Sequence, residues 1–250
     1  MTAPLQTPND PLADPAPPQP APALAPPVKW WRRDDVAYAA PMLVFLSFTQ
    51  LGVSFNDYYP LSYIAKVIVV SILLVYSWKH YTKIRWDFWW LGVIVGVVGI
   101  FQWVGMQLWL QNHFSYFAPP GAEDIFNPFL KFSSPATAWS FIAVRMIGAV
   151  LVVPVMEELF WRDFLWREII APNDFKLAKV GEFEWPAVLI VAGAFALVHG
   201  NWWLTSIVWA LMIAALLIYT KSLGACIIAH AVTNLLLALY VLKTQDWAFW

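Results

Sequence analysis

Six polar residues stand in largely apolar segments of the chain, at spacings that could support hydrolysis. They form three short groups: Glu157, Glu158 and Arg162, then His199, then His230 and Asn234. A carboxylate and an imidazole together can deprotonate a water molecule. A second imidazole and a side-chain amide can donate hydrogen bonds to an oxyanion. The set is therefore sufficient to hydrolyse an amide bond without a covalent intermediate.

Helical spacing predicts which of these side chains share a face. His230 precedes Asn234 by four residues, so both point from one face of a helix. Glu158 precedes Arg162 by four residues and can pair with it. Because Glu157 lies about 100° around the helix from Glu158, its carboxylate is free to face a cavity. We expect three helices to direct polar groups into one shared interior.

The same residues leave other interpretations open. Glu157, His199 and His230 could be the three protein ligands of a catalytic zinc ion. The polar groups could instead hydrogen-bond between helices in a non-enzymatic membrane scaffold or immunity-type interaction protein. Buried Glu and His also mark proton-coupled carriers, although no inverted repeat is visible. The HExxH, GxSG and GxGD motifs of other membrane hydrolases are missing from the sequence.

The composition of the chain is typical of a polytopic membrane protein. Of the 250 residues, 60% are hydrophobic and 12% are charged, against roughly 25% charged in a soluble domain. The net charge of −1 gives no reason to expect nucleic-acid binding. Cys226 is the single cysteine, which excludes a disulfide framework and a Cys-rich zinc site. We expect an all-α bundle of about seven transmembrane helices.

Seven apolar segments approach the length of about 20 residues that a bilayer core about 30 Å thick requires. The fifth and sixth are nearly continuous, so Gly200 and Asn201 are predicted to form a tight turn. The predicted spans are 36–55, 61–78, 88–110, 139–165, 187–203, 204–220 and 223–243.

The basic residues predict the orientation of these spans. With the N-terminus placed inside, the inner segments carry eleven Lys and Arg and the outer segments carry two. This asymmetry favours an integral protein of a bacterial inner (plasma) membrane with a cytoplasmic N-terminus. Arg145 falls within a span, where we expect it to pair with a carboxylate, the alternative being that it binds a peptide C-terminus.

The N-terminal segment differs from the rest. Residues 1–28 contain ten of the nineteen prolines and are predicted to form a disordered Pro/Ala-rich tail. Residues 29–250 then form a transmembrane helical domain, with the catalytic motifs within 138–243.

The three polar groups resemble the signature of the CPBP family, which includes the CaaX proteases and bacteriocin-processing enzymes. That family is marked by EExxxR, FxxxH and HxxxN on three membrane helices, in that order. The corresponding stretches are Glu157-Glu158-Leu-Phe-Trp-Arg162, Phe195-Ala-Leu-Val-His199 and His230-Ala-Val-Thr-Asn234. The first stretch, with Met156, also resembles the CaaX prenyl protease-related subgroup associated with exosortase systems.

The resemblance implies a membrane-embedded endopeptidase that cuts a membrane-associated substrate, of which a lipidated, CaaX-like peptide is one form. By similarity, Glu157 and His199 activate the water, and His230 with Asn234 forms the oxyanion site. Glu158 would support Glu157.

By the same similarity, Arg162 holds the motif helix in place. The family has been described both as metal-dependent and as glutamate-dependent. We expect a glutamate-type mechanism, because ligands at unequal apparent depths would make a poor metal site. A zinc cofactor remains the alternative.

Overall fold

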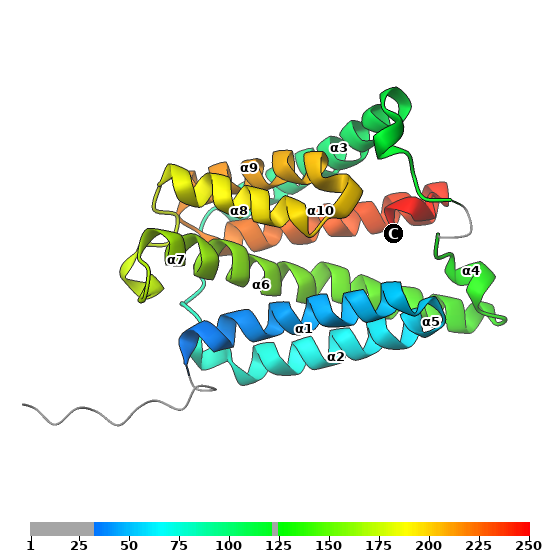
Figure 1. Ribbon diagram of the computed structural model, residues 1–250, viewed down its shortest axis with the longest axis horizontal. Coiled ribbons are helices and arrows are strands. Elements are labelled where there is room, and N and C mark those ends of the chain that lie inside the picture. Colours follow the sequence, from blue (N-terminus) through cyan, green and yellow to red (C-terminus); the bar gives the residue numbers. More distant parts are fainter. Residues whose placement is uncertain (1–32, 122–124) are drawn as a thin grey trace, which may run out of the picture.

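The structure is a computed structural model that describes residues 33–121 and 125–250. Within these residues the chain is helical and contains no strand (Figure 1). The predicted tail, residues 1–28, lies outside the described residues. The α-helices are α1 (Asp34–Ser54), α2 (Tyr59–Tyr76), α3 (Trp89–His113), α4 (Pro128–Lys131), α5 (Pro135–Ile147), α6 (Val153–Glu158), α7 (Trp166–Ile170), α8 (Trp185–Leu197), α9 (Trp203–Thr220) and α10 (Leu223–Thr244).

The expected polytopic helical fold is confirmed. Six helical segments in the described chain are long and apolar enough to cross a membrane: Asp34–Ser54, Asn56–Tyr76, Trp89–His113, Pro135–Ile170, Gly200–Thr220 and Leu223–Thr244. The predicted fifth span is shorter than expected, because α8 has only 13 residues. At 1.5 Å per residue it is about 20 Å long. The predicted turn follows it, with Gly200 at φ +54°.

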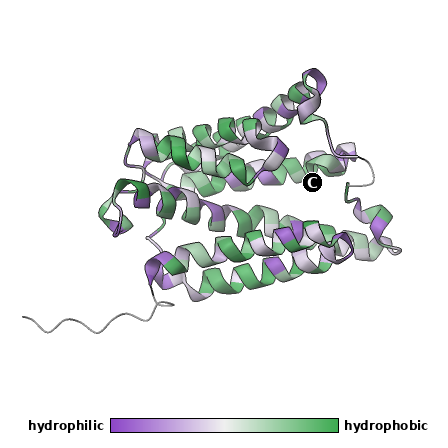
Figure 2. Cartoon of the chain, in the orientation of Figure 1, coloured by the Kyte–Doolittle hydropathy of each residue, from purple (hydrophilic) through white to green (hydrophobic). Residues whose placement is uncertain are grey.

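The outside of the bundle is covered by large apolar side chains. Val75, Phe101 and Tyr219 are about three-quarters exposed, at 75%, 74% and 74%. Green, hydrophobic ribbon accordingly runs along most of the helices in Figure 2. A water-soluble monomer rarely exposes so much continuous apolar surface. The chain is therefore an integral membrane protein.

The helices α5, α6 and α7 form one continuous helix that runs across the bundle. Two π-helical segments, Gly148–Val152 and Leu159–Leu165, interrupt its α-helical hydrogen bonding. They lie immediately before and after α6, which ends with Glu157 and Glu158. Such π segments are rare and occur frequently at functional sites.

Helices α3 and α10 pack closely because glycines line their interface. An added Cβ on Gly96 would lie 2.7 Å from the Ala229 carbonyl oxygen and 2.7 Å from the Val232 Cβ. The Thr233 hydroxyl donates to the Gly96 carbonyl at 2.9 Å. Small residues that bring two backbones together are typical of membrane helix pairs. This contact fixes the position of α10, which carries the third motif.

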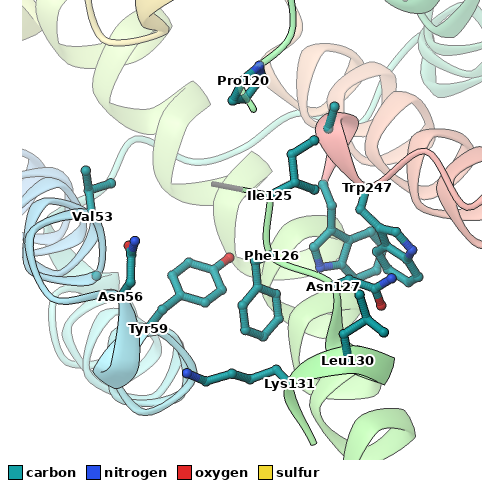
Figure 3. Close-up of a pocket in the computed structure, with 13 residues that line it drawn as sticks. Val53, Asn56, Tyr59, Pro120, Ile125, Phe126, Asn127, Leu130, Lys131 and Trp247 are labelled. Atoms are coloured by element: carbon teal, nitrogen blue, oxygen red, sulfur yellow. The ribbon is translucent and has the colours of Figure 1, made fainter. Parts of the chain in front are cut away.

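A wide cavity opens at the end of the bundle where α1 turns into α2. It has a volume of about 640 Å³ and lies between that turn, the loop that leads into α4 and the C-terminal segment (Figure 3). Tyr59, Phe126 and Trp247 are among its lining residues. No polar group of the three motifs lines this cavity.

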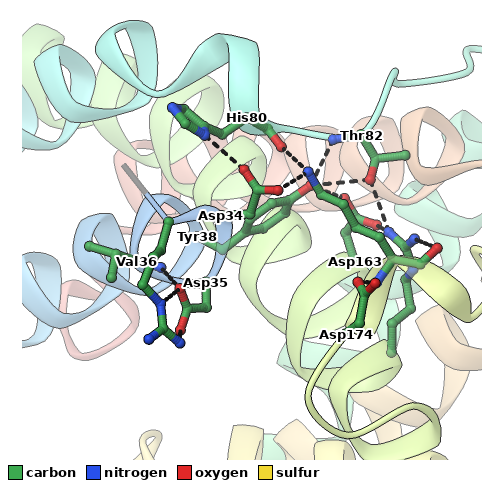
Figure 4. Close-up of polar contacts among 11 residues, drawn as sticks. Asp34, Asp35, Val36, Tyr38, His80, Thr82, Asp163 and Asp174 are labelled. Carbon is green, nitrogen blue, oxygen red and sulfur yellow. Dashed lines mark hydrogen bonds and ion pairs between the residues drawn. The ribbon is translucent and has the colours of Figure 1, made fainter. Parts of the chain in front are cut away.

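A buried polar network closes the opposite end of the bundle (Figure 4). The Tyr38 hydroxyl donates to the Asp163 carboxylate at 2.6 Å. Arg167 forms an ion pair with Asp163, and its guanidinium also donates to the Thr82 hydroxyl at 2.9 Å. The network therefore ties α1 and the α2–α3 loop to the helix that carries the first motif.

Candidate active site

The three motifs converge on one small cavity, as their spacing predicts. It has a volume of about 130 Å³, and its lining includes Glu157 from α6, His199 just after α8, and His230 and Asn234 from α10. Phe195, the first residue of the second motif, lines it as well. The fold therefore brings together four of the six candidate site residues around a single space.

The two neighbouring glutamates face different surroundings. Glu157 lines the cavity and is 7% exposed, whereas Glu158 is completely buried. Glu158 accepts hydrogen bonds from His230 Nδ1 at 2.8 Å and from Arg162 Nη1 at 3.3 Å. The family resemblance implies that Glu158 supports Glu157, but these bonds connect it to His230 and Arg162. Arg162 in turn lies over the Phe195 ring, 4.9 Å from its centroid.

His199 is oriented by the backbone of α8, the helix that precedes it. Its Nδ1 atom lies 2.6 Å from the carbonyl oxygen of Phe195. A carbonyl can only accept, so Nδ1 must carry the hydrogen. In the neutral ring, Nε2 then has the free lone pair and can accept a proton. The second motif thus fixes its histidine in the tautomer that a general base needs.

His230 is oriented by a carboxylate. Its Nδ1 atom donates to Glu158, which leaves Nε2 to act on the cavity side. A carboxylate behind an imidazole fixes the orientation of the ring and stabilises a positive charge on it. Glu158 is held by the nearby Arg162 guanidinium, since Nε of Arg162 lies 3.3 Å from its Oε2. Arg162, Glu158 and His230 therefore form a chain of contacts that leads from buried protein to the cavity.

Asn234 is positioned by the first π segment. Its Nδ2 donates to the carbonyl oxygen of Ala149 at 2.8 Å. In a π-helix the donor for that carbonyl would come from residue 154, five positions later. That residue is Pro154, which has no N–H to give. Asn234 supplies the missing donor, and its second amide hydrogen remains available.

The three candidate zinc ligands meet at the small cavity. Glu157, His199 and His230 line the same cavity, and both histidines have Nδ1 occupied in the way that metal-bound histidines usually do. However, within residues 33–121 and 125–250 no group of three or more His, Cys, Asp or Glu side chains is arranged to hold a metal ion.

The expectation that Arg145 pairs with a carboxylate is wrong for the described residues. Its guanidinium carbon lies 4.8 Å from the ring centroid of Trp250, 5.1 Å from that of Tyr63 and 5.7 Å from that of Tyr59. No described carboxylate lies in ion-pair range of it. Aromatic faces attract a cation through their quadrupole, which explains this placement.

Sequence reasoning missed two tryptophans that complete the cavity wall. Trp103 from α3 and Trp209 from α9 both line it. Their rings meet the two histidines edge-on, with centroids 5.8 Å apart for Trp103 and His199, and 6.0 Å apart for Trp209 and His230. The sequence contains many tryptophans near span ends, where interfacial anchoring explains most of them. Trp103 and Trp209 could therefore not be distinguished from the anchoring residues.

Residues 138–236 match the model of the family described as type II CAAX prenyl endopeptidase Rce1-like. Comparison with curated proteins and with solved structures found no match. The matched segment begins in α5, ends within α10 and contains all three motifs. It also contains every side chain of the Arg162–Glu158–His230 chain of contacts. Over these helices the chain is similar to the type II CAAX prenyl endopeptidase Rce1-like family.

Proposed function

We propose that this protein is an intramembrane endopeptidase that hydrolyses a peptide bond of a membrane-associated substrate. The observation that carries the proposal is the convergence of Glu157, His199, His230 and Asn234 on one cavity. Both histidines are fixed through Nδ1, so each can act through Nε2. The match of residues 138–236 to a protease family supports the same reaction class.

In the proposed reaction, Glu157 and His199 Nε2 bind a water molecule and remove its proton as the oxygen attacks the peptide carbonyl. The carbonyl oxygen becomes an oxyanion. Protonated His230 donates to it through Nε2, while its Nδ1–H stays bonded to Glu158. Asn234 donates its second amide hydrogen. The proton held by the glutamate–histidine pair then passes to the leaving amine as the C–N bond breaks.

The supporting residues have a different role. Glu158 and Arg162 lie behind His230 and do not line the cavity. We propose that they are positioning residues, which keep the ring of His230 oriented and balance its charge during the reaction. Their effect on catalysis therefore passes through His230.

We propose that the water is activated by side chains and not by a tightly bound zinc ion, because the three candidate ligands do not form a metal-holding group in the described chain. The substrate is a membrane-associated protein or peptide, with a lipidated CaaX-like segment as the form that the family name suggests. The distribution of basic residues supports a bacterial inner membrane and a cytoplasmic N-terminus.

The test is quantitative profiling of protein termini in the native host, comparing wild type with Glu157→Gln at equal membrane abundance. New termini found only with the wild type support proteolysis and identify the substrate. Identical profiles would contradict the proposal and favour a scaffold, for which the interhelical bonds of Glu158 and Asn234 would be structural.

A further inference from the structure

Three cavities of the structure share lining residues and follow one another through the bundle. The wide cavity in Figure 3 shares Trp250 with a cavity of about 220 Å³ beside α5. That second cavity shares Asn234 and Leu237 with the candidate active site. The three cavities therefore form a series that leads from the end of the bundle at the α1–α2 turn to the candidate active site.

Arg145 is the charged residue on this path. It lines the middle cavity, one helical turn before Ala149. No hydrogen bond from its guanidinium to another described residue is present, and no described carboxylate is in ion-pair range. Its five N–H donors are thus without an acceptor in the described part of the chain.

An arginine at membrane depth is costly unless its charge is balanced. The rings of Trp250, Tyr63 and Tyr59 stabilise the cation through their faces, but they accept no conventional hydrogen bonds from its edge. The edge of a guanidinium is a planar fork that matches the two oxygens of a carboxylate. The aromatic rings hold the guanidinium of Arg145 at the wall of the middle cavity. A carboxylate is the ligand that would accept hydrogen bonds from its free N–H groups.

We propose that Arg145 binds a carboxylate of the substrate and so determines which peptides reach the active site. This inference rests on the proposed endopeptidase function. The carboxylate is either the C-terminus of the peptide or an Asp or Glu side chain.

The continuous helix α5–α7 also fixes the distance between Arg145, which would bind the carboxylate, and Glu157 in the candidate active site. Arg145 and Glu157 lie twelve residues apart on one continuous helix, which corresponds to about 18 Å along its axis. An extended peptide covers about 3.3–3.6 Å per residue. The recognised carboxylate therefore lies about five residues from the bond that is cut.

The test measures binding, so that it does not depend on cleavage. The Glu157→Gln protein in lipid nanodiscs is incubated with pools of apolar decapeptides of mixed sequence. One pool has a free C-terminal carboxylate, one is C-terminally amidated, and one is amidated with a single Glu at varied positions. Mass spectrometry quantifies the retained peptides, and empty nanodiscs give the background.

We expect the acidic pools to be retained about tenfold or more over the neutral pool. Arg145→Gln should abolish this preference, and Arg145→Lys should keep only part of it, because an ammonium lacks the planar fork. Lys66→Met is the matched control. Lys66 is another buried cation, but it donates to Thr49 at 3.1 Å and lines none of the three cavities. It should leave the preference unchanged.

Retention by the free-acid pool alone would identify the C-terminal carboxylate, and retention of the Glu pool would identify a side chain. Equal retention of acidic and neutral peptides by the parent protein would overturn the inference. That result would leave the termini profiles, and hence the proposed proteolysis, unaffected.

Discussion

Replacing Gly96 with alanine should separate α3 from α10 and weaken both stability and activity. The added Cβ would lie 2.7 Å from the Ala229 carbonyl oxygen, whereas ordinary contact begins at 3.4 Å. The helices must therefore move apart by about 0.7 Å, since a backbone oxygen cannot rotate away. Overpacking of this kind typically costs about 1–3 kcal/mol. His230 follows Ala229 directly, so the same shift displaces the histidine of the third motif.

Gly105→Ala provides the matched control, because Gly105 lies on the same helix and an added Cβ there meets nothing within 4 Å. Both substitutions replace glycine by a better helix former, which favours each variant by about 1 kcal/mol. The difference between them therefore isolates the clash at the α3–α10 interface.

Thermal unfolding in detergent, followed by circular dichroism, should show a lower midpoint for Gly96→Ala than for Gly105→Ala. A displacement approaching 1 Å at reacting groups can cost about 10²-fold in rate. Cleavage of a substrate identified by termini profiling should thus fall by about one to two orders of magnitude in Gly96→Ala only. Equal midpoints and equal rates for the two variants would refute the argument that this interface positions the site.

Three further substitutions and one treatment distinguish residues that support the site from residues that react. Glu158→Gln leaves the buried Arg162 without its carboxylate, which should cost about 3–5 kcal/mol of unfolding free energy in chemical denaturation; an unchanged denaturation curve would contradict the assigned ion pair. Glu157→Gln should abolish cleavage while the unfolding midpoint stays near that of the wild type, and a large loss of stability would instead indicate a structural carboxylate. Asn234→Ala should lower the cleavage rate about 10²–10³-fold and also destabilise the helix by about 1–3 kcal/mol, because the Ala149 carbonyl loses its donor; full activity would exclude it from the oxyanion site. Dialysis against a chelator should leave cleavage intact, with substoichiometric zinc by elemental analysis, whereas stoichiometric zinc and activity restored by zinc would reassign the cavity side chains as ligands.

Much of the fold could be predicted from the sequence because hydropathy and helical periodicity are local properties. The last span was predicted at 223–243 and is observed at Leu223–Thr244. The Glu158–Arg162 pair and the cavity-facing position of Glu157 followed from spacing on one helix. The turn at Gly200 followed from the near-continuity of two apolar segments.

Other features depend on contacts between helices that are distant in sequence. Spacing alone could not place Glu158 against His230, 72 positions later in the chain. The role of Asn234 required the π segment, whose signal in the sequence is only Pro154. Arg145 was expected to find a carboxylate, but the fold surrounds it with aromatic rings from other segments. The sequence around Asn234 or Arg145 carries no local pattern that would have predicted these contacts.

The short helix α8 has a consequence for the lipid around the protein. Its 13 residues cover about 20 Å, some 10 Å less than a typical bilayer core. Such hydrophobic mismatch is relieved by local thinning of the bilayer or by water that reaches the end of the helix. The turn at Val198 and His199, which follows α8, needs the same hydration at membrane depth. His199 follows the end of α8 and lines the cavity, so thinning of the bilayer at this helix would shorten the path of water to the cavity.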